Sequence, residues 1–81
     1  MVKTLHTSAY EHLCSLLVAA RETVGLTQSD LATRLGRPQS FVSKYETGER
    51  RLDVLEFLQI CQALDADFHA ILIAVQARME A

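Results

Sequence analysis

The chain has 81 residues, of which 49% are hydrophobic, with one proline and three glycines. A chain of this length forms one small domain. The core of such a domain is too small to bury all of these hydrophobic residues, and apolar surface left exposed favours self-association. The net charge of −2 excludes a uniformly basic nucleic-acid binder. However, five of the eight Lys and Arg residues fall between Arg34 and Arg51, and this cluster predicts a local phosphate-binding surface.

The cysteines and histidines predict neither a cofactor site nor an enzyme. Cys14 and Cys61 lie singly in apolar segments, so we expect buried thiols in a reducing cytoplasm. The histidines lack metal-ligand spacing, and the Ser, Cys and His residues do not assemble a catalytic set. No apolar run is long enough to span a membrane. We therefore expect a cytoplasmic protein, not an enzyme, with no metal, no cofactor and no membrane association.

The first part of the chain predicts two helices behind a flexible arm of residues 1–7. Ser8 begins the first helix, because an acidic residue three positions later completes a capping box. Apolar residues then recur at helical spacing as far as Gly25, which ends the helix. Thr27 and Asp30 form a second capping box, so the second helix begins there and runs to the next glycine.

Three more helices are expected in the rest of the chain. The third starts at Pro38, which a first helical turn accepts, and ends before Gly48. Asp53 opens a broadly apolar fourth helix with another capping box, and Asp67 caps the last helix. The sequence lacks the alternation typical of strands. We expect a compact, all-α, five-helix domain over residues 8–81.

The last helix carries two apolar stripes, more than one small core covers. The first stripe holds most of the large apolar residues, and the second holds Ile73 with three alanines. We expect one stripe to face a second copy of the chain; the alternative is simply a well-covered C-terminal helix. The predicted homodimer interface contains Ile71, Leu72, Ile73, Val75 and Met79.

The third helix has a polar face and an apolar face. Helical spacing places five polar residues on one side: Gln39, Ser40, Ser43, Lys44 and Thr47. Side chains of these types hydrogen-bond base edges in the major groove of double-stranded DNA. We predict that the first four read bases; the alternative is an ordinary solvated helix surface. Phe41 lies on the border of the two faces, and its direction stays open.

Groups suited to DNA phosphates surround this helix. Gln28 opens the second helix, where its side chain and the free N–H groups of the helix start suit an anion. The arginines lie in the turns before and after the third helix. The predicted contacts to the DNA backbone are Thr27, Gln28, Arg37, Thr47, Arg50 and Arg51.

Two charged residues occupy inward-facing positions. Arg21 lies on the apolar stripe of the first helix, and Glu46 lies on the inner face of the third. Because a buried charge requires a partner, we predict that they form an ion pair joining these helices. The alternative is that both side chains reach out to solvent.

The chain resembles the Cro- and lambda-repressor-type helix-turn-helix family, also called the XRE family. The matching segments are Ala20–Glu22, Gly25–Ala32, Leu35–Gly36, Gln39–Arg51 and Leu52–Leu64. The resemblance runs from about Leu17 to Leu72 and departs from the family at Arg37 and Pro38, where an apolar residue and a Ser or Thr cap are common. It implies a five-helix domain that binds a palindromic operator as a dimer. It also implies a phosphate contact by Gln28 and the ion pair of Arg21 and Glu46. The base-reading residues that it implies are those predicted above: Gln39, Ser40, Ser43 and Lys44.

We therefore predict a sequence-specific DNA-binding transcriptional regulator that acts as a homodimeric repressor on a palindromic operator. One alternative is an antitoxin that represses its own operon and has a toxin as its protein partner. Another is an adaptor that uses the same fold to bind protein only.

Overall fold

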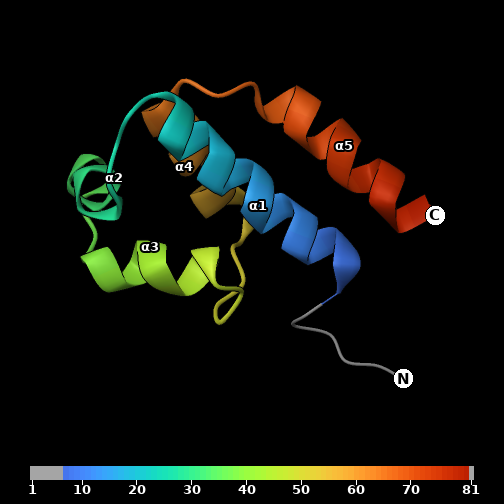
Figure 1. The fold of residues 1–81 in the computed structure, drawn as a ribbon, viewed down its shortest axis with the longest axis horizontal. Helices are drawn as coiled ribbons and strands as arrows, with labels where there is room; N and C mark the ends of the chain where they lie inside the picture. Colours follow the sequence, from blue (N-terminus) through green and yellow to red (C-terminus); the bar gives the residue numbers. More distant parts are fainter. Residues whose placement is uncertain (1–6, 81) are drawn as a thin grey trace.

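The computed structural model describes residues 7–80, which form five helices with no strand among them (Figure 1). The helices are α1 (Ser8–Thr23), α2 (Gln28–Leu35), α3 (Gln39–Glu46), α4 (Val54–Leu64) and α5 (Phe68–Glu80). The predicted all-α architecture is confirmed. All but the last residue of the predicted N-terminal arm lies outside the described residues.

Side-chain caps determine where α2 and α4 begin. The Thr27 hydroxyl accepts a hydrogen bond from the Asp30 N–H at 3.0 Å, and the Asp30 carboxylate accepts one from the Thr27 N–H at 2.9 Å. This second bond holds the pKa of Asp30 below its usual value. Asp53 and Glu56 form the same reciprocal box at the start of α4. Two of the three predicted capping boxes are thus present, and the one predicted at Ser8 is not.

Two other helix starts differ from the prediction by one residue. Thr7, not Ser8, caps α1, since its hydroxyl accepts from the Tyr10 N–H at 3.1 Å. Threonine and serine are both good N-caps, so the pattern of residue types alone does not distinguish the two positions. Pro38 precedes α3 as its N-cap and makes no side-chain hydrogen bond to the helix.

The turn between α2 and α3 depends on a residue in the left-handed conformation. Gly36 has φ 66°, a value that side chains other than glycine rarely adopt. The Arg37 N–H then donates to the Ala32 carbonyl at 3.0 Å, which closes α2. Asp65 has φ 54° and closes α4 in the same way, although no glycine stands at this position.

The core lies between α1, α2, α3 and α4. Its fully buried side chains are Leu17, Leu31, Val42, Tyr45, Ile60, Cys61 and Leu64. Phe41 joins them with 7% of its surface exposed, so the side chain whose direction the sequence left open points inward. Its ring meets that of Tyr45 edge to face, with 5.6 Å between the centroids.

Figure 1 shows α5 running alongside α1. Ile71, Ala74 and Val75 are half-buried. Their i, i+3, i+4 spacing is that of a helix that packs on one neighbour. Leu72 and Met79 are exposed, although the prediction grouped them with Ile71 and Val75 on one stripe. Helical spacing does place these residues on one side of α5, but contact with α1 covers only part of that side. None of the described helices is both long and apolar enough to cross a membrane.

The ion pair predicted between α1 and α3 is present. Arg21 Nε lies 2.8 Å from Glu46 Oε2, and Arg21 Nη2 donates to Glu46 Oε1 at 3.2 Å. The two side chains are only 12% and 5% exposed. Arg21 also donates to the Leu26 carbonyl at 2.7 Å, and the hydrogen bond to Glu46 raises its pKa. The pair therefore joins the two helices as charged groups.

Two phenols permit a matched test of buried hydrogen bonding. The Tyr45 hydroxyl is buried and has no hydrogen-bond partner among the described residues, whereas the Tyr10 hydroxyl has one. Tyr45→Phe should leave the free energy of unfolding unchanged or increase it, while Tyr10→Phe should lower it by about 0.5–1.5 kcal/mol. Denaturant unfolding measures both changes. Equal losses in the two variants would contradict the hydrogen-bond assignment.

Removing one partner of the ion pair should destabilise the fold strongly. Glu46→Ala leaves the Arg21 guanidinium without its carboxylate and should lower the free energy of unfolding by about 3–5 kcal/mol. The double change Arg21→Met with Glu46→Leu removes both charges and should recover much of that loss. Thermal unfolding compares the three proteins. A melting temperature for Glu46→Ala equal to that of the wild type would show that the pair contributes nothing.

Candidate nucleic-acid interface

α3 presents its predicted polar side outward. Phe41, Val42 and Tyr45 are buried on the inner side. The outer side carries Gln39, Ser40, Ser43, Lys44 and Thr47, all exposed except the half-buried Ser43. The four predicted base-reading residues therefore share one face of a short helix whose other face is fixed in the core.

A chain of hydrogen bonds orients Gln39. Its Nε2 donates to Gln28 Oε1 at 2.7 Å, and Gln28 Nε2 donates to Glu46 Oε1 at 2.8 Å. Because a carboxylate only accepts, Gln28 must turn its amide nitrogen toward Glu46 and its oxygen toward Gln39. Gln39 is left with its own amide oxygen and one N–H available for a ligand.

This chain gives Gln28 a role that the sequence did not indicate. The sequence predicted a phosphate contact for its side chain, but in the structure both ends of the amide are engaged with α3. One N–H of Gln28 remains beyond these bonds. The half-buried side chain of Gln28 thus connects the ion pair of Arg21 and Glu46 to the polar outer face of α3.

Two of the predicted phosphate-binding arginines share one carboxylate. Arg50 binds Glu56 with two parallel hydrogen bonds of 2.9 and 2.8 Å, and Arg37 binds it at 3.3 Å. The guanidinium carbons of Arg37 and Arg50 lie 4.0 and 5.0 Å from the centroid of the Phe41 ring. The hydrogen bonds from Arg50 are the main cause of a Glu56 pKa of about 2. The sequence predicted only a capping role for Glu56, at the start of α4.

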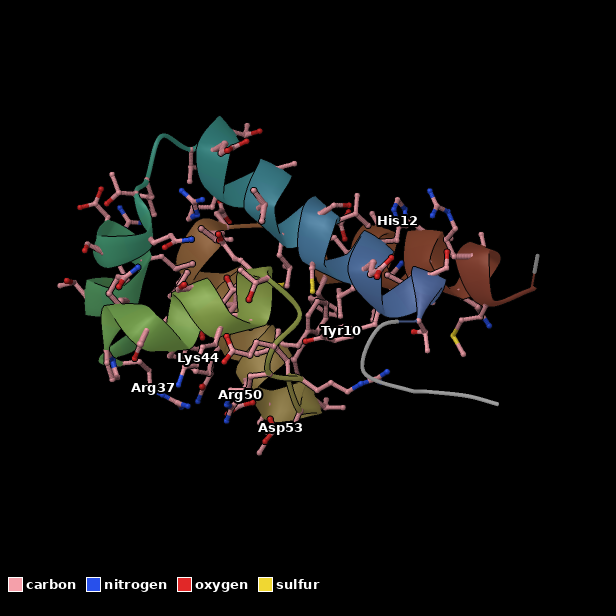
Figure 2. All side chains as sticks on the ribbon, turned by 60° about the horizontal axis from the view of Figure 1, so that its bottom comes forward. Tyr10, His12, Arg37, Lys44, Arg50 and Asp53 are labelled. Carbon is pink, nitrogen blue, oxygen red and sulfur yellow. The ribbon has the colours of Figure 1, made fainter. Side chains whose placement is uncertain are left out.

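The remaining predicted contact residues differ in their freedom. Lys44 and Arg51 are exposed, and the described residues provide neither with a carboxylate partner. Arg51 lies over the Tyr10 ring, 4.7 Å from its centroid. The hydroxyl of Thr27 is engaged in its cap, and that of Thr47 donates to the Lys44 carbonyl at 3.2 Å. Figure 2 shows Arg37, Lys44 and Arg50 along the same edge of the molecule.

The two cysteines lie inside the protein. The Cys14 thiol donates to the Tyr45 carbonyl at 3.1 Å, and burial raises its pKa. Burial also raises the pKa of Cys61 to about 11, so both groups stay protonated and unreactive at neutral pH. Within residues 7–80, no three His, Cys, Asp or Glu side chains gather as metal ligands would.

A second candidate surface is apolar and lies on α5 and α4. Of the five predicted dimer-interface residues, Leu72, Ile73 and Met79 are exposed, whereas Ile71 packs against the core and Val75 is half-buried. Four further exposed apolar residues lie on these helices and were not among the predicted interface residues. They are Val54, Leu55, Leu58 and Phe68. Two of them, Leu58 and Phe68, line one hollow between α4 and α5.

Comparison with known proteins identifies relatives of this fold. A family model described as a helix-turn-helix domain matches residues 7–70. An XRE-family like protein from Pseudomonas syringae pv. tomato str. DC3000 is 51% identical, with 86% of this chain and 85% of that chain covered and a TM-score of 0.81. The search among curated proteins gave no significant match.

Two solved restriction-modification controller proteins are also similar. C.AhdI from Aeromonas hydrophila is 26% identical, with 80% of this chain and 98% of that chain covered and a TM-score of 0.73. C.Esp1396I, solved as a tetramer in complex with its natural 35 base-pair operator, is 17% identical. That match covers 94% of this chain and all of the other, with a TM-score of 0.78, and it shows a shared fold.

The family model spans most of the sequence, and the Pseudomonas protein shares half of its residues with this chain over most of both lengths. The five-helix arrangement and the short α2 and α3 joined at Gly36 agree with these matches. The chain belongs to the helix-turn-helix domain family and is of the XRE type.

Proposed function

We propose that this protein is a sequence-specific DNA-binding transcriptional regulator that reads the major groove with α3. The observation that carries the proposal is the polar outer face of α3, on which Gln39 is held in one orientation by Gln28. The similarity to C.Esp1396I, which was solved on its operator, supports the same conclusion.

The available groups on α3 suit particular base edges. The free amide oxygen and N–H of Gln39 match the N6 donor and N7 acceptor of adenine. Lys44 donates to guanine acceptors, and the hydroxyls of Ser40 and Ser43 serve either purine or pyrimidine edges. Because the side chain of Gln28 fixes the amide of Gln39 before binding, less side-chain entropy is lost on the correct base.

Contacts to phosphates complete the proposed interface. Arg37, Arg50 and Arg51 flank α3, and a cation beside a DNA strand releases condensed counterions when it meets a phosphate. Thr27, Thr47 and the start of α2 are further proposed contacts to the backbone. The local positive charge allows binding although the whole chain carries −2.

Substitutions should separate base reading from phosphate binding. After a preferred site has been selected from random duplexes, Gln39→Ala and Lys44→Ala should each cost about 1–3 kcal/mol and relax preference at particular base pairs. Arg51→Ala should weaken all sequences similarly and reduce the salt dependence. Arg78→Ala, which removes the same charge from α5, is the control. Fluorescence anisotropy measures every affinity.

Two results would contradict this assignment. A uniform loss of affinity in all of these variants, with unchanged base preference, would remove α3 as the reading helix. Failure of the wild type to bind any duplex even at low salt would leave the protein-binding adaptor as the better reading of the fold.

We further propose that the protein acts as a homodimeric repressor on a palindromic operator. The exposed Leu72, Ile73 and Met79 on α5 form an apolar surface that a second copy would cover. Two reading helices about one DNA turn apart, roughly 34 Å, require half-sites about 10 base pairs between centres. Repression needs nothing beyond occupancy of such a site.

A charge on α5 tests the dimer. Ile73→Asp places a carboxylate in the proposed interface and should give a folded monomer with much weaker operator binding, because burying an unpaired charge is costly. Ile73→Leu keeps the same position apolar and should change neither property. Sedimentation measures the oligomeric state. A wild type that is monomeric at tens of micromolar at every concentration tested would overturn the free dimer.

A further inference from the structure

We propose that Glu56 determines specificity by fixing Arg37 and Arg50 beside α3 and cancelling one of their two charges. The two arginines then favour the operator over random DNA. The inference rests on the proposed DNA binding, and it adds a residue of α4 to the base-reading and phosphate-binding residues already proposed. Glu56 acts through the arginines, so it is a positioning residue.

Hydrogen bonds occupy both oxygens of the Glu56 carboxylate. Oε1 accepts from Arg50 Nη1 at 2.9 Å and from the Asp53 N–H at 3.0 Å. Oε2 accepts from Arg50 Nη2 at 2.8 Å and from Arg37 Nη2 at 3.3 Å. The Glu56 side chain is 13% exposed, against 36% and 40% for Arg37 and Arg50. The carboxylate therefore lies behind two guanidinium groups that solvent, or a phosphate, reaches first.

This carboxylate brings together arginines from opposite ends of α3. Arg37 precedes the helix and Arg50 follows it, yet both guanidinium groups lie against Phe41. Phe41 is itself buried on α3, so the distance between the two cations is fixed relative to the reading face. Freely moving arginine side chains would reach phosphates at any position of the protein along the DNA. Arginines held at a fixed distance fit the phosphates best at one position.

The charge of the cluster also limits binding to random DNA. Arg37, Arg50 and Glu56 together carry one positive charge instead of two. When a protein binds duplex DNA, it releases counterions from the phosphates that it neutralises. For each such phosphate, the plot of log affinity against log salt concentration becomes steeper by about 0.9. One additional effective charge corresponds to about a fivefold higher affinity near 0.15 M salt. Glu56 would thus suppress binding that carries no sequence information.

The test variant is Glu56→Gln, whose amide oxygen still accepts the Asp53 N–H and keeps the cap. We expect its affinity for a random duplex to rise about fivefold at 0.15 M salt, with a slope steeper by about 0.9. Operator affinity should rise less, because the arginines lose their fixed places. The ratio of operator to random affinity should therefore fall. Circular dichroism checks that the variant folds.

Glu49→Gln is the matched control. It removes the same charge from the turn that precedes α4, but the Glu49 carboxylate is exposed and has no ion-pair partner in the described part of the chain. We expect a much smaller change in the ratio than for Glu56→Gln. Equal changes in the two variants would show that only the total charge matters and would overturn the role of Glu56.

A second variant separates placement from charge and covers the case in which Glu56→Gln does not fold. Glu56→Asp keeps the charge but is too short to hold both arginines, so operator affinity should fall while the salt slope for random DNA stays the same. Unchanged operator affinity would overturn the positioning role. If the wild type binds no duplex, the proposed function itself fails, and that result appears before any variant is compared.

Discussion

The buried carboxylate of Glu46 is the constraint on which the arrangement of the first three helices depends. It lies on α3, is almost fully removed from solvent, and accepts two hydrogen bonds from Arg21 of α1 and one from Gln28 of α2. A carboxylate in such a place is tolerated only when its oxygens are satisfied. The need to satisfy it therefore sets how α1, α2 and α3 meet, and the orientation of Gln39 follows from it.

Most features that the sequence predicted correctly depend on neighbouring residues. The ion pair of Arg21 and Glu46 is the exception, because two inward-facing charges of opposite sign indicated it across two helices. Thr27 with Asp30 and the glycine at position 36 are local signals, and they placed α2 and the turn after it. The polar face of α3 also followed from helical periodicity alone. The inward direction of Phe41 and the second role of Glu56 did not, because both depend on Arg37 and Arg50 meeting in space. No pattern within one helix encodes that meeting.

The two candidate surfaces divide the molecule by chemistry. The side formed by α2, α3 and the following turn carries amides, hydroxyls and arginines, and its arginines are partly balanced by Glu56. The side formed by α4 and α5 exposes apolar residues such as Leu55 and Ile73. A chain that carries −2 overall can bind a polyanion only if its cations are collected in this way.

The start of α3 has a consequence for how the protein opens. α3 has eight residues, and its N-cap, Pro38, makes no side-chain hydrogen bond to it. A helix this short does not persist alone in water, so packing of Phe41, Val42 and Tyr45 against the core holds it. The surface on α3 therefore melts together with the core as one cooperative unit. If the amide protons of α3 exchange with solvent only when the whole core unfolds, their protection factors should be close to those of the most stable helix.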